Sequence, residues 1–323
     1  MYMVRICSLG AASQDVFMSG KNIKSHLDAI EHDYVESFKL GAKIEADHIS
    51  FATGGGATNA AVTFARQGIE SSFIGKLGRD IPAEGVIAEL DRDNVDSHQV
   101  IYDEVHGTQY STVLLTESGE RTILIYRGVA NTHRPQDYES IDFTQYDWLY
   151  ISSFGGAVDA LDLIFHKALA SGVKIAFNPG DSELDQMDKL KPLLEDIDIL
   201  IVNKEEAQLI VDGSDLEELT RHLLHIVRLA IVSDGPNGVM ASDGKTIVRA
   251  GMYEDVKVID RTGAGDAFGS GFLSQWSQGR SLKDSIVFAS ANSTSVVTKI
   301  GAKSGILHKG ATLHAMPLSE KDF

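Results

Sequence analysis

The sequence predicts an α/β fold in which a mostly parallel central sheet is covered by helices on both faces. Short apolar runs, rich in β-branched and aromatic residues, alternate along the chain with longer segments of helical periodicity. The apolar runs are nearly continuous, which is typical of parallel strands buried on both faces. The length of 323 residues suits one large domain that spans residues 1–323.

The predicted strands and helices follow one another in a regular order. Strands are expected at the short apolar runs, which span residues 4–9, 72–74, 148–151, 174–177, 199–202 and 230–232. Helices are expected at the longer periodic segments, which span residues 57–67, 83–93, 161–171, 216–226 and 281–299. The single cysteine, Cys7, falls in the first apolar run, so we expect it to be buried, and no disulfide can form within the chain.

Two segments, residues 16–50 and 100–128, break this alternation. The first is polar and has no counterpart in a minimal α/β unit. In the second, apolar and polar residues alternate over 112–116 and 121–126 around a turn at 118–120, which is the pattern of a β-hairpin. We expect the two segments to pair as a small β-sheet that forms a lid over the site.

The acidic composition limits the partners of the chain. The formal net charge is −17 at pH 7, which argues against nucleic acid and anionic membranes as partners. No apolar window approaches the length of a membrane span, and the N-terminal apolar run is too short for a signal-peptide core. The scattered histidines show no metal-binding spacing. We therefore expect a cytoplasmic protein that acts on a small molecule.

The most informative segment is a glycine-rich turn at residues 260–266. Apolar residues 256–259 predict a strand before the turn, and aromatic residues at every fourth position over 268–276 predict a helix after it. The N–H groups of residues 263–265 would then converge at a helix N-terminus, which favours an anion. Asp266 lies at the same place, so the segment indicates a phosphoryl site with a base inside it. The alternative is that Asp266 only caps the helix.

Two nucleotide-binding motifs are approached by the sequence but not matched. A dinucleotide fingerprint fails at this turn because its third glycine would be residue 268, which is Phe. A P-loop fails at residues 238–246, because five residues separate the two glycines where the motif needs four. We expect residues 238–246 to form a hairpin instead. A dinucleotide-dependent oxidoreductase remains a remote alternative.

Three further segments have both a structural and a functional interpretation. The glycines at 54–56 precede a helix of small residues, and Asn59 offers a donor and an acceptor that suit a sugar hydroxyl. Asn203 and Glu206 have the spacing of a capping box, and the same pair could organise hydrated Mg²⁺ beside phosphates. Residues 233–238 are either a plain turn or a shelf for a nucleotide.

Taken together and in this order, these segments resemble the PfkB carbohydrate kinase family. The resemblance spans essentially the whole chain and is most specific at residues 54–59 and 260–266. It implies a three-layer ribokinase-like fold and an ATP- and Mg²⁺-dependent transfer of a phosphoryl group to a hydroxymethyl group of a sugar or sugar derivative. A nucleoside kinase of the same family is the alternative, and a catalytically silent ligand-binding relative is a more remote one.

The resemblance also implies roles for individual residues. Asp266 would be the catalytic base, and the anion hole would comprise Gly263, Ala264 and Gly265. The sugar side would comprise Asp15, Gly54, Gly55 and Asn59. The nucleotide and phosphate side would comprise Asn178, Asn203, Glu206, Ser233, Gly235, Gly238 and Asn292.

The resemblance implies ion sites and an assembly as well. Glu206 would hold Mg²⁺ through water, while Asp260 and Thr262 would bind an activating monovalent cation, most commonly K⁺. The lid would mediate a homodimer, as it often does in relatives. From its charge alone, Arg121 on the predicted hairpin favours an anionic or polyhydroxy substrate, so we include it among the substrate-binding residues.

Overall fold

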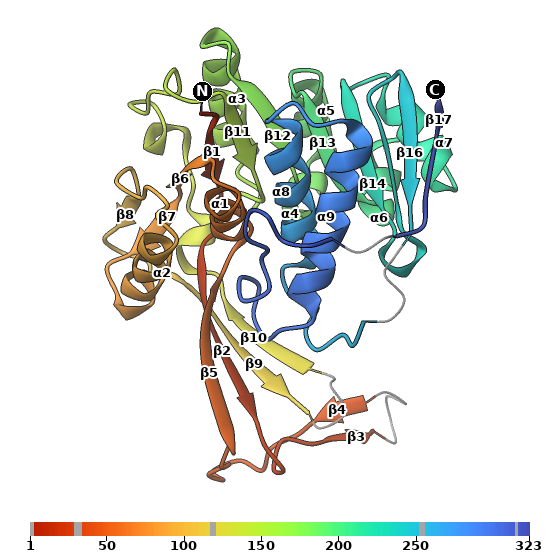
Figure 1. Cartoon of the computed structure of the whole chain (residues 1–323). Helices are drawn as coiled ribbons and strands as arrows, with labels where there is room; N and C mark the ends of the chain where they lie inside the picture. Colours follow the sequence, from red (N-terminus) through yellow and green to blue (C-terminus); the bar gives the residue numbers. More distant parts are fainter. Residues whose placement is uncertain (1–2, 29–33, 117–120, 252–255, 314–315) are drawn as a thin grey trace.

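The computed structural model describes residues 3–28, 34–116, 121–251, 256–313 and 316–323. Among these residues the main sheet has nine strands in the order β17-β16-β15-β14-β13-β12-β11-β1-β6 (Figure 1). The six predicted apolar runs all lie in its parallel part, which comprises β1 (Arg5–Leu9), β6 (Glu70–Ile74), β11 (Trp148–Ile151), β12 (Lys174–Phe177), β13 (Ile199–Asn203) and β14 (Leu229–Ser233). The sheet continues in antiparallel fashion with β15 (Val239–Ser242), β16 (Thr246–Ala250) and β17 (Leu318–Asp322).

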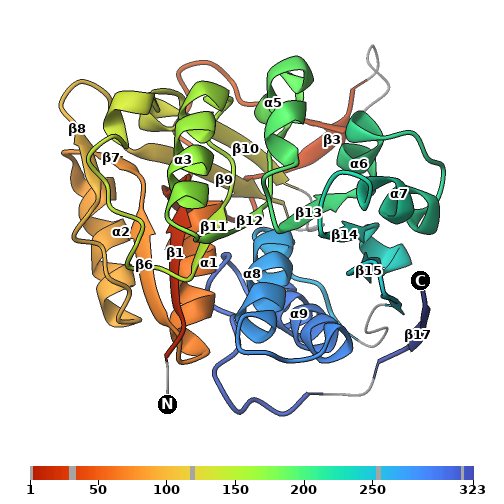
Figure 2. The same cartoon turned by 90° about the horizontal axis from the view of Figure 1, so that it is seen from above.

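Helices cover both faces of the main sheet, as Figure 2 shows from above. One face packs against α3 (Val158–Ala170), α5 (Met187–Leu194), α6 (Lys204–Ile210) and α7 (Leu216–Leu223). The other packs against α1 (Gly56–Arg66), α8 (Ala264–Trp276) and α9 (Leu282–Val297). Successive strand residues point to opposite faces of the sheet and so pack into the hydrophobic cores on its two sides. Leu200, for example, packs on the first face and Ile201 on the second. The predicted three-layer α/β class is confirmed.

The remaining helices lie at the margins of this sandwich. They are α2 (Ile81–Arg92), beside the β6 edge, and the short α4 (Asp181–Leu184). Cys7 is fully buried in β1, as predicted. No helix formed by the described residues is both long enough and apolar enough to cross a bilayer.

A second, four-stranded sheet projects from the main body (Figure 1). Its order is β10-β9-β2-β5, with β2 (Ser13–Ser19), β5 (His48–Gly54), β9 (Gln109–Leu115) and β10 (Arg121–Tyr126). β9 and β10 pair antiparallel, as predicted for a hairpin, although the predicted turn at 118–120 lies outside the described residues. β3 (Ser25–Leu27) pairs with β4 (Tyr34–Glu36) as a separate two-stranded piece. We call the four-stranded unit the small sheet.

The small sheet differs from its predicted bounds at both of its segments. β2 already begins at Ser13, because the strand alternation extends past the predicted start at residue 16. Residues 101–103 form β8 (Ile101–Asp103), which pairs with β7 (Lys76–Gly78) in another sheet rather than with the hairpin. Residues 128–131 form a 3₁₀ turn.

Two other local predictions have opposite outcomes. Residues 238–246 are a hairpin, because β15 and β16 pair antiparallel, and a P-loop is thereby ruled out. The strand predicted at 256–259 is wrong, since these residues are in no strand. Their backbone meets a helix end instead of a sheet edge, because the N–H of Ile259 donates to the carbonyl of Val297 at the end of α9.

Candidate active site

The N-terminus of α8 forms the centre of the site. Its N-cap, Gly263, has φ 77°, a backbone conformation that residues with a side chain rarely adopt. A Cβ there would overlap Ala302. A Cβ at Gly265 would meet no described heavy atom within 4 Å, so this residue faces open space. Of the predicted anion-hole groups, the N–H of Ala264 makes a 3.3 Å bond to the carbonyl of Arg261 within the turn. The helix end therefore presents a glycine backbone to an open space.

Asp266 lies in the first turn of α8 and is partly buried. Its Oδ2 accepts a hydrogen bond of 2.8 Å from Nδ2 of Asn59 on α1. Burial raises the pKa of Asp266, while this hydrogen bond and the charge of Lys303 oppose the rise. The other amide atom of Asn59, Oδ1, is buried and has no hydrogen-bond partner among the described residues. An acceptor of this kind is suited to a hydroxyl donor from outside the chain.

Asp15 lies on the small sheet, on β2, and is 7% exposed. Its Oδ1 accepts a 3.3 Å bond from the Ser13 hydroxyl. Burial raises the pKa of Asp15, opposed by the hydrogen bond from Ser111 and the charge of Lys303. The carboxylate of Asp15 thus comes from the small sheet, and that of Asp266 comes from a helix that covers the main sheet.

The predicted glycines at 54–56 bring these carboxylates together at the start of α1. A Cβ at Gly54 would overlap the carboxylate of Asp15, and a Cβ at Gly56 would lie 3.0 Å from Oδ1 of Asp266. Gly55 is the N-cap of α1 with φ 94°, and a Cβ there would overlap Ala11. Glycine is required here because backbone and carboxylates approach one another so closely.

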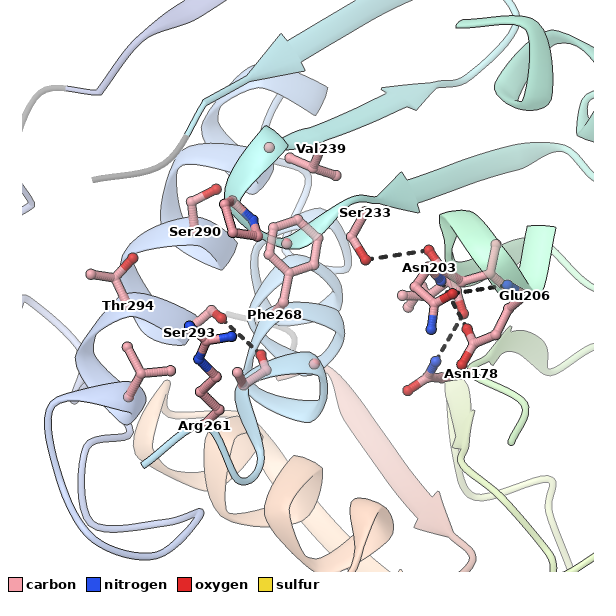
Figure 3. A pocket seen from close by; sticks show the side chains of 18 of the residues that line it. Asn178, Asn203, Glu206, Ser233, Val239, Arg261, Phe268, Ser290, Ser293 and Thr294 are labelled. Carbon is pink, nitrogen blue, oxygen red and sulfur yellow. Dashed lines mark hydrogen bonds between the residues drawn. The ribbon is translucent and has the colours of Figure 1, made fainter. Parts of the chain in front are cut away.

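A cavity of about 440 Å³ lies beside the N-terminus of α8 (Figure 3). It includes Ala264 and Gly265 and is lined mainly by apolar side chains, among them Val239 and Phe268. Apart from Asn292, every residue predicted for the nucleotide side lines it: Asn178, Asn203, Glu206, Ser233, Gly235 and Gly238. Its size and apolar lining are those of a site for a planar, drug-sized ligand.

Polar side chains stand at both ends of this cavity. On one side, Asn178 and Asn203 lie at the ends of β12 and β13, and Glu206 lies in the first turn of α6, as Figure 3 shows. Asn203 and Glu206 do form the predicted capping box, with two reciprocal bonds of 2.8 Å between side chain and backbone. Burial raises the pKa of the Glu206 carboxyl, against the hydrogen bond from the Asn203 backbone. The structural interpretation of this pair is therefore correct, and both side chains also line the cavity.

Asn292 is the exception on α9. It is fully buried, its Nδ2 donates to the carbonyl of Ala267 at 2.8 Å, and its Oδ1 accepts from the N–H of Leu307 at 2.9 Å. The side chain thus ties α9 to α8 and does not line the cavity. The cavity face of α9 has helical spacing and carries residues that sequence reasoning missed: Ser290, Ser293, Thr294 and Val297.

Asp260 organises the loop before α8. Its Oδ1 accepts 3.0 Å and 2.7 Å bonds from the N–H and hydroxyl of Thr262, and its Oδ2 accepts a 3.1 Å bond from the N–H of Gly301. Nη1 of Arg121, on β10, lies 3.5 Å from Oδ1. Arg121 therefore connects the small sheet to this loop, and its one described charged partner is Asp260.

Lys303 lies in no motif that marks it as a site residue in the sequence. This residue is 3% exposed, and its ammonium donates 2.9 Å hydrogen bonds to the hydroxyls of Thr53 and Thr58. Burial lowers the pKa of Lys303 to about 8. The sequence Gly-Ala-Lys-Ser-Gly around it gives no sign of burial, because the contacts that enclose it come from elements some 250 residues away.

Three comparisons place the chain among known proteins. A family model described as pfkB family carbohydrate kinase matches residues 27–309. The ribokinase of Haemophilus influenzae is 27% identical over 301 residues, which cover 89% of this chain and 96% of that protein. Solved structures of a nucleoside kinase from Methanocaldococcus jannaschii and of a putative ribokinase II from E. coli, the latter in complex with ATP and Mg²⁺, superpose with TM-scores of 0.77 and 0.78.

These structures are 21% and 20% identical to the chain, cover 94% of it, and are themselves covered to 95% and 96%. At such low identity the likeness establishes the fold, which is ribokinase-like.

Proposed function

We propose that this chain, which belongs to the pfkB family of carbohydrate kinases, transfers the γ-phosphoryl group of ATP to a hydroxymethyl group of a sugar or sugar derivative. One observation carries the proposal. Asp266 lies in the first turn of the helix whose N-terminus borders the cavity, and its partner Asn59 keeps a buried oxygen without a described partner. A nucleotide on one side and a hydroxyl on the other would meet at this carboxylate.

In the proposed step, Asp266 takes the proton of the attacking hydroxyl as the new O–P bond forms. The bond between the γ-phosphorus and the bridging oxygen breaks, and ADP leaves. The backbone N–H groups of Gly263 and Gly265, at the positive end of α8, would stabilise the charge that develops on the transferred group, while the N–H of Ala264 already donates to the carbonyl of Arg261. Asn59 fixes Asp266 and accepts from the substrate, which positions the base.

The cavity suits ATP in two respects. The apolar lining around Val239 and Phe268 would accommodate a purine, and the polar side chains at the strand ends, Asn178 and Asn203, would bind the phosphates. The related E. coli structure in complex with ATP and Mg²⁺ supports the same assignment.

Glu206 fits a role in holding Mg²⁺ through water. No group of three or more His, Cys, Asp or Glu in the described ranges could hold a metal by protein ligands alone. Mg²⁺ commonly keeps several waters and binds phosphates with one or two carboxylates, and Glu206 supplies one carboxylate at the cavity. When bound, the ion would neutralise charge on the phosphates.

The residues at the loop before α8 also fit a monovalent cation. Oδ2 of Asp260 has one described donor, the N–H of Gly301, and the hydroxyl oxygen of Thr262 keeps its lone pairs. Oxygen ligands of this kind suit K⁺, which would share the Asp260 carboxylate with Arg121. Activity in K⁺ compared with tetramethylammonium at equal ionic strength tests this assignment.

The small sheet would act as the lid and as a dimer surface, with the whole chain as one domain. Asp15 on β2 faces the site, and closure of the sheet would exclude water from the reaction. Phe51 and Leu124 occupy register positions on the face opposite Asp15 and are 67% and 60% exposed. A second copy of the chain would cover such an apolar face, and light scattering on the purified protein measures its mass.

A nucleoside kinase is the second candidate, and one observation favours it. On the face of the small sheet that carries Asp15, the edge strand β10 presents Ile123 and Ile125, which are 40% and 49% exposed, with β9 between β10 and the strand of Asp15. An apolar surface beside a sugar-binding carboxylate suits a base attached to the sugar.

The test is a panel of sugars, sugar phosphates, sugar acids and nucleosides with ATP, Mg²⁺ and K⁺. ADP release is coupled to NADH oxidation, and ³¹P NMR identifies the product. We expect release that depends on one class of acceptor and a phosphomonoester product. ADP release that no acceptor in the panel stimulates would contradict the proposal.

A further inference from the structure

A buried positive charge lies on the sugar side of the site. The ammonium of Lys303 contacts two threonine hydroxyls at 2.9 Å, and none of the described carboxylate oxygens comes within 4.0 Å of it. One carboxylate is linked to it indirectly, because the Thr53 hydroxyl that accepts from Lys303 itself donates to Glu89. A charge removed from water without a carboxylate in direct contact is costly, and such a residue is uncommon in a protein interior. The position of Lys303 therefore needs an explanation beyond packing.

The two threonines place this ammonium between the carboxylates of the site. Thr58 immediately precedes Asn59, which donates to Asp266, and both lie in the first turn of α1. Thr53 immediately precedes Gly54, where a Cβ would overlap Asp15. The two threonines that bind Lys303 are thus each one residue away from a residue beside a carboxylate, Asn59 beside Asp266 and Gly54 beside Asp15.

The backbone around Lys303 is held firmly. Nη1 of Arg66 donates to the carbonyls of Lys303 and Ile306 at 2.7 Å and 3.2 Å. Nε of Arg66 in turn lies 2.7 Å from the carboxylate of Asp93. Because Arg66 at the end of α1 holds the backbone of this segment and Thr58 in the first turn of α1 holds the ammonium, the side chain has little freedom to withdraw toward solvent.

We propose that Lys303 is a positioning residue whose buried ammonium keeps Asp266, and with it Asp15, in the ionised form that the phosphoryl transfer needs. The inference rests on the proposed kinase function, since only that function makes Asp266 a base. Lys303 does not touch the reacting atoms; it acts through the field that it creates at the two carboxylates.

The charged groups around the site support this assignment. Glu89 on α2, Asp15 on β2 and Asp266 on α8 all favour the charged form of Lys303, while burial and Arg66 oppose it. In the other direction, Lys303 lowers the pKa of both Asp15 and Asp266 against burial.

Tyr150 on β11 also senses the charge of Asp266, and burial raises the pKa of Tyr150 far above its usual range. The phenol is therefore neutral at physiological pH, and Lys303 is the cation that faces Asp266.

The competing explanation is that Lys303 merely ties β5 to α1 through Thr53 and Thr58. Lys303→Gln separates the two explanations, because the amide keeps two N–H donors and loses the charge. Lys303→Arg keeps the charge and provides the rescue. Lys309→Met is the matched control, since it removes an exposed lysine from the same segment.

The decisive measurement is a titration of Asp266 itself. Aspartate labelled with ¹³C at the carboxyl carbon is incorporated into the whole chain, and Asp266→Asn assigns the resonance. We expect Lys303→Gln to raise the titration midpoint of Asp266 by about one pH unit, a tenfold change in proton affinity, and Lys303→Arg and Lys309→Met to leave it in place. An unchanged midpoint in folded Lys303→Gln overturns the proposal.

The wild-type protein gives a second readout that needs no variant. As the pH rises through about 8, Lys303 loses its proton, and the Asp266 resonance should show a second inflection there. If Lys303→Gln does not fold, as circular dichroism would show, this inflection decides the matter, and its absence overturns the proposal.

An activity arm links the titration to catalysis. With an acceptor from the panel, the rise of kcat with pH on the acid side should shift to higher pH by about one unit in Lys303→Gln. At the high-pH plateau, kcat of this variant should return to the wild-type value. A plateau lowered at every pH, with the limb unmoved, indicates the structural tie and contradicts the proposal. The carboxyl titration needs no acceptor. Failure to find an acceptor would therefore count against the kinase function but would not affect the titration result for Lys303.

Discussion

The proposed nucleotide side and sugar side of Asp266 are lined by different kinds of side chain. On the nucleotide side the site is a cavity of about 440 Å³ with a mainly apolar lining, and its polar groups stand at strand and helix ends. On the sugar side Asp15 and Lys303 are buried charges, and Asn59 is a buried amide with an orphaned oxygen. In the proposed reaction, the nucleotide side would select mainly by shape. The sugar side would select by charge and hydrogen bonding, which reject a wrong ligand more strongly than an apolar pocket does.

Asp266→Asn should have the largest effect, because it removes the base that both sides share. We expect kcat to fall by about 10²–10⁴-fold, while ATP still binds, since the cavity is unaltered. Steady-state kinetics and calorimetric titration with ATP measure the two quantities. Asp159→Asn, in the first turn of α3, is the matched control and should behave as wild type. Loss of ATP binding in Asp266→Asn would show that the two sides are not separable.

Asn59→Ala tests the sugar side alone. The change removes the donor to Asp266 and the orphaned acceptor together. We expect kcat/KM for the acceptor to fall by about 10–100-fold, the usual consequence of one to two lost buried hydrogen bonds. The KM for ATP, measured in the same assay, should stay within a factor of about two. An equal rise in both KM values would contradict the division into two sides.

Thr294→Trp is the counterpart on the nucleotide side. Thr294 lines the cavity from α9, so an indole there would occupy part of the space for the nucleotide (Figure 3). We expect the KM for ATP to rise by about tenfold or more and the KM for the acceptor to stay unchanged. Thr294→Ser, which removes only a methyl group, serves as the control. An acceptor KM that rises with that for ATP would show that the cavity extends to the sugar side.

The structural features that the sequence predicted correctly depend on local chemistry. Gly263, Gly55 and the Asn203–Glu206 capping box are each required by backbone geometry within a few residues, which a single sequence displays. The parallel strands were recognisable for the same reason, as continuous apolar runs. Such features need no knowledge of distant contacts.

The parts that were missed depend on contacts across the chain. Asn292 lies on the wrong face of α9 for the cavity, and the sequence of a helix buried on several sides does not reveal which face meets a ligand. Lys303 is enclosed by β5 and α1, so its burial appears only after folding. Residues 256–259 have the composition of a strand but find a helix end as their partner.

The carboxylate of Asp266 should also lower the stability of the folded protein at neutral pH. Burial raises the pKa of Asp266 in the folded protein. The contribution of Asp266 to the free energy of unfolding is therefore present below its unfolded pKa and is lost as the pH rises through its folded pKa. Asp266→Asn should therefore have a higher Tm than wild type at neutral pH, with the gap closing toward about pH 4. Thermal unfolding across this range measures it. A variant less stable than wild type at neutral pH would show that Asp266 is well compensated.

Arg121→Ala should have the smallest effect, and it decides whether the small sheet contributes a charge to the substrate. The guanidinium lies 3.5 Å from Asp260 and is 31% exposed, and Asp260 retains its bonds from Thr262 and Gly301 without it. A half-exposed ion pair of this kind contributes about 1 kcal/mol or less, so we expect kcat/KM for the acceptor to fall by no more than about fivefold. Arg121→Lys should restore most of the loss. A fall of about 100-fold, mostly in the KM of an anionic acceptor, would instead mean that Arg121 leaves Asp260 and binds the substrate when the sheet closes, as its charge alone predicted.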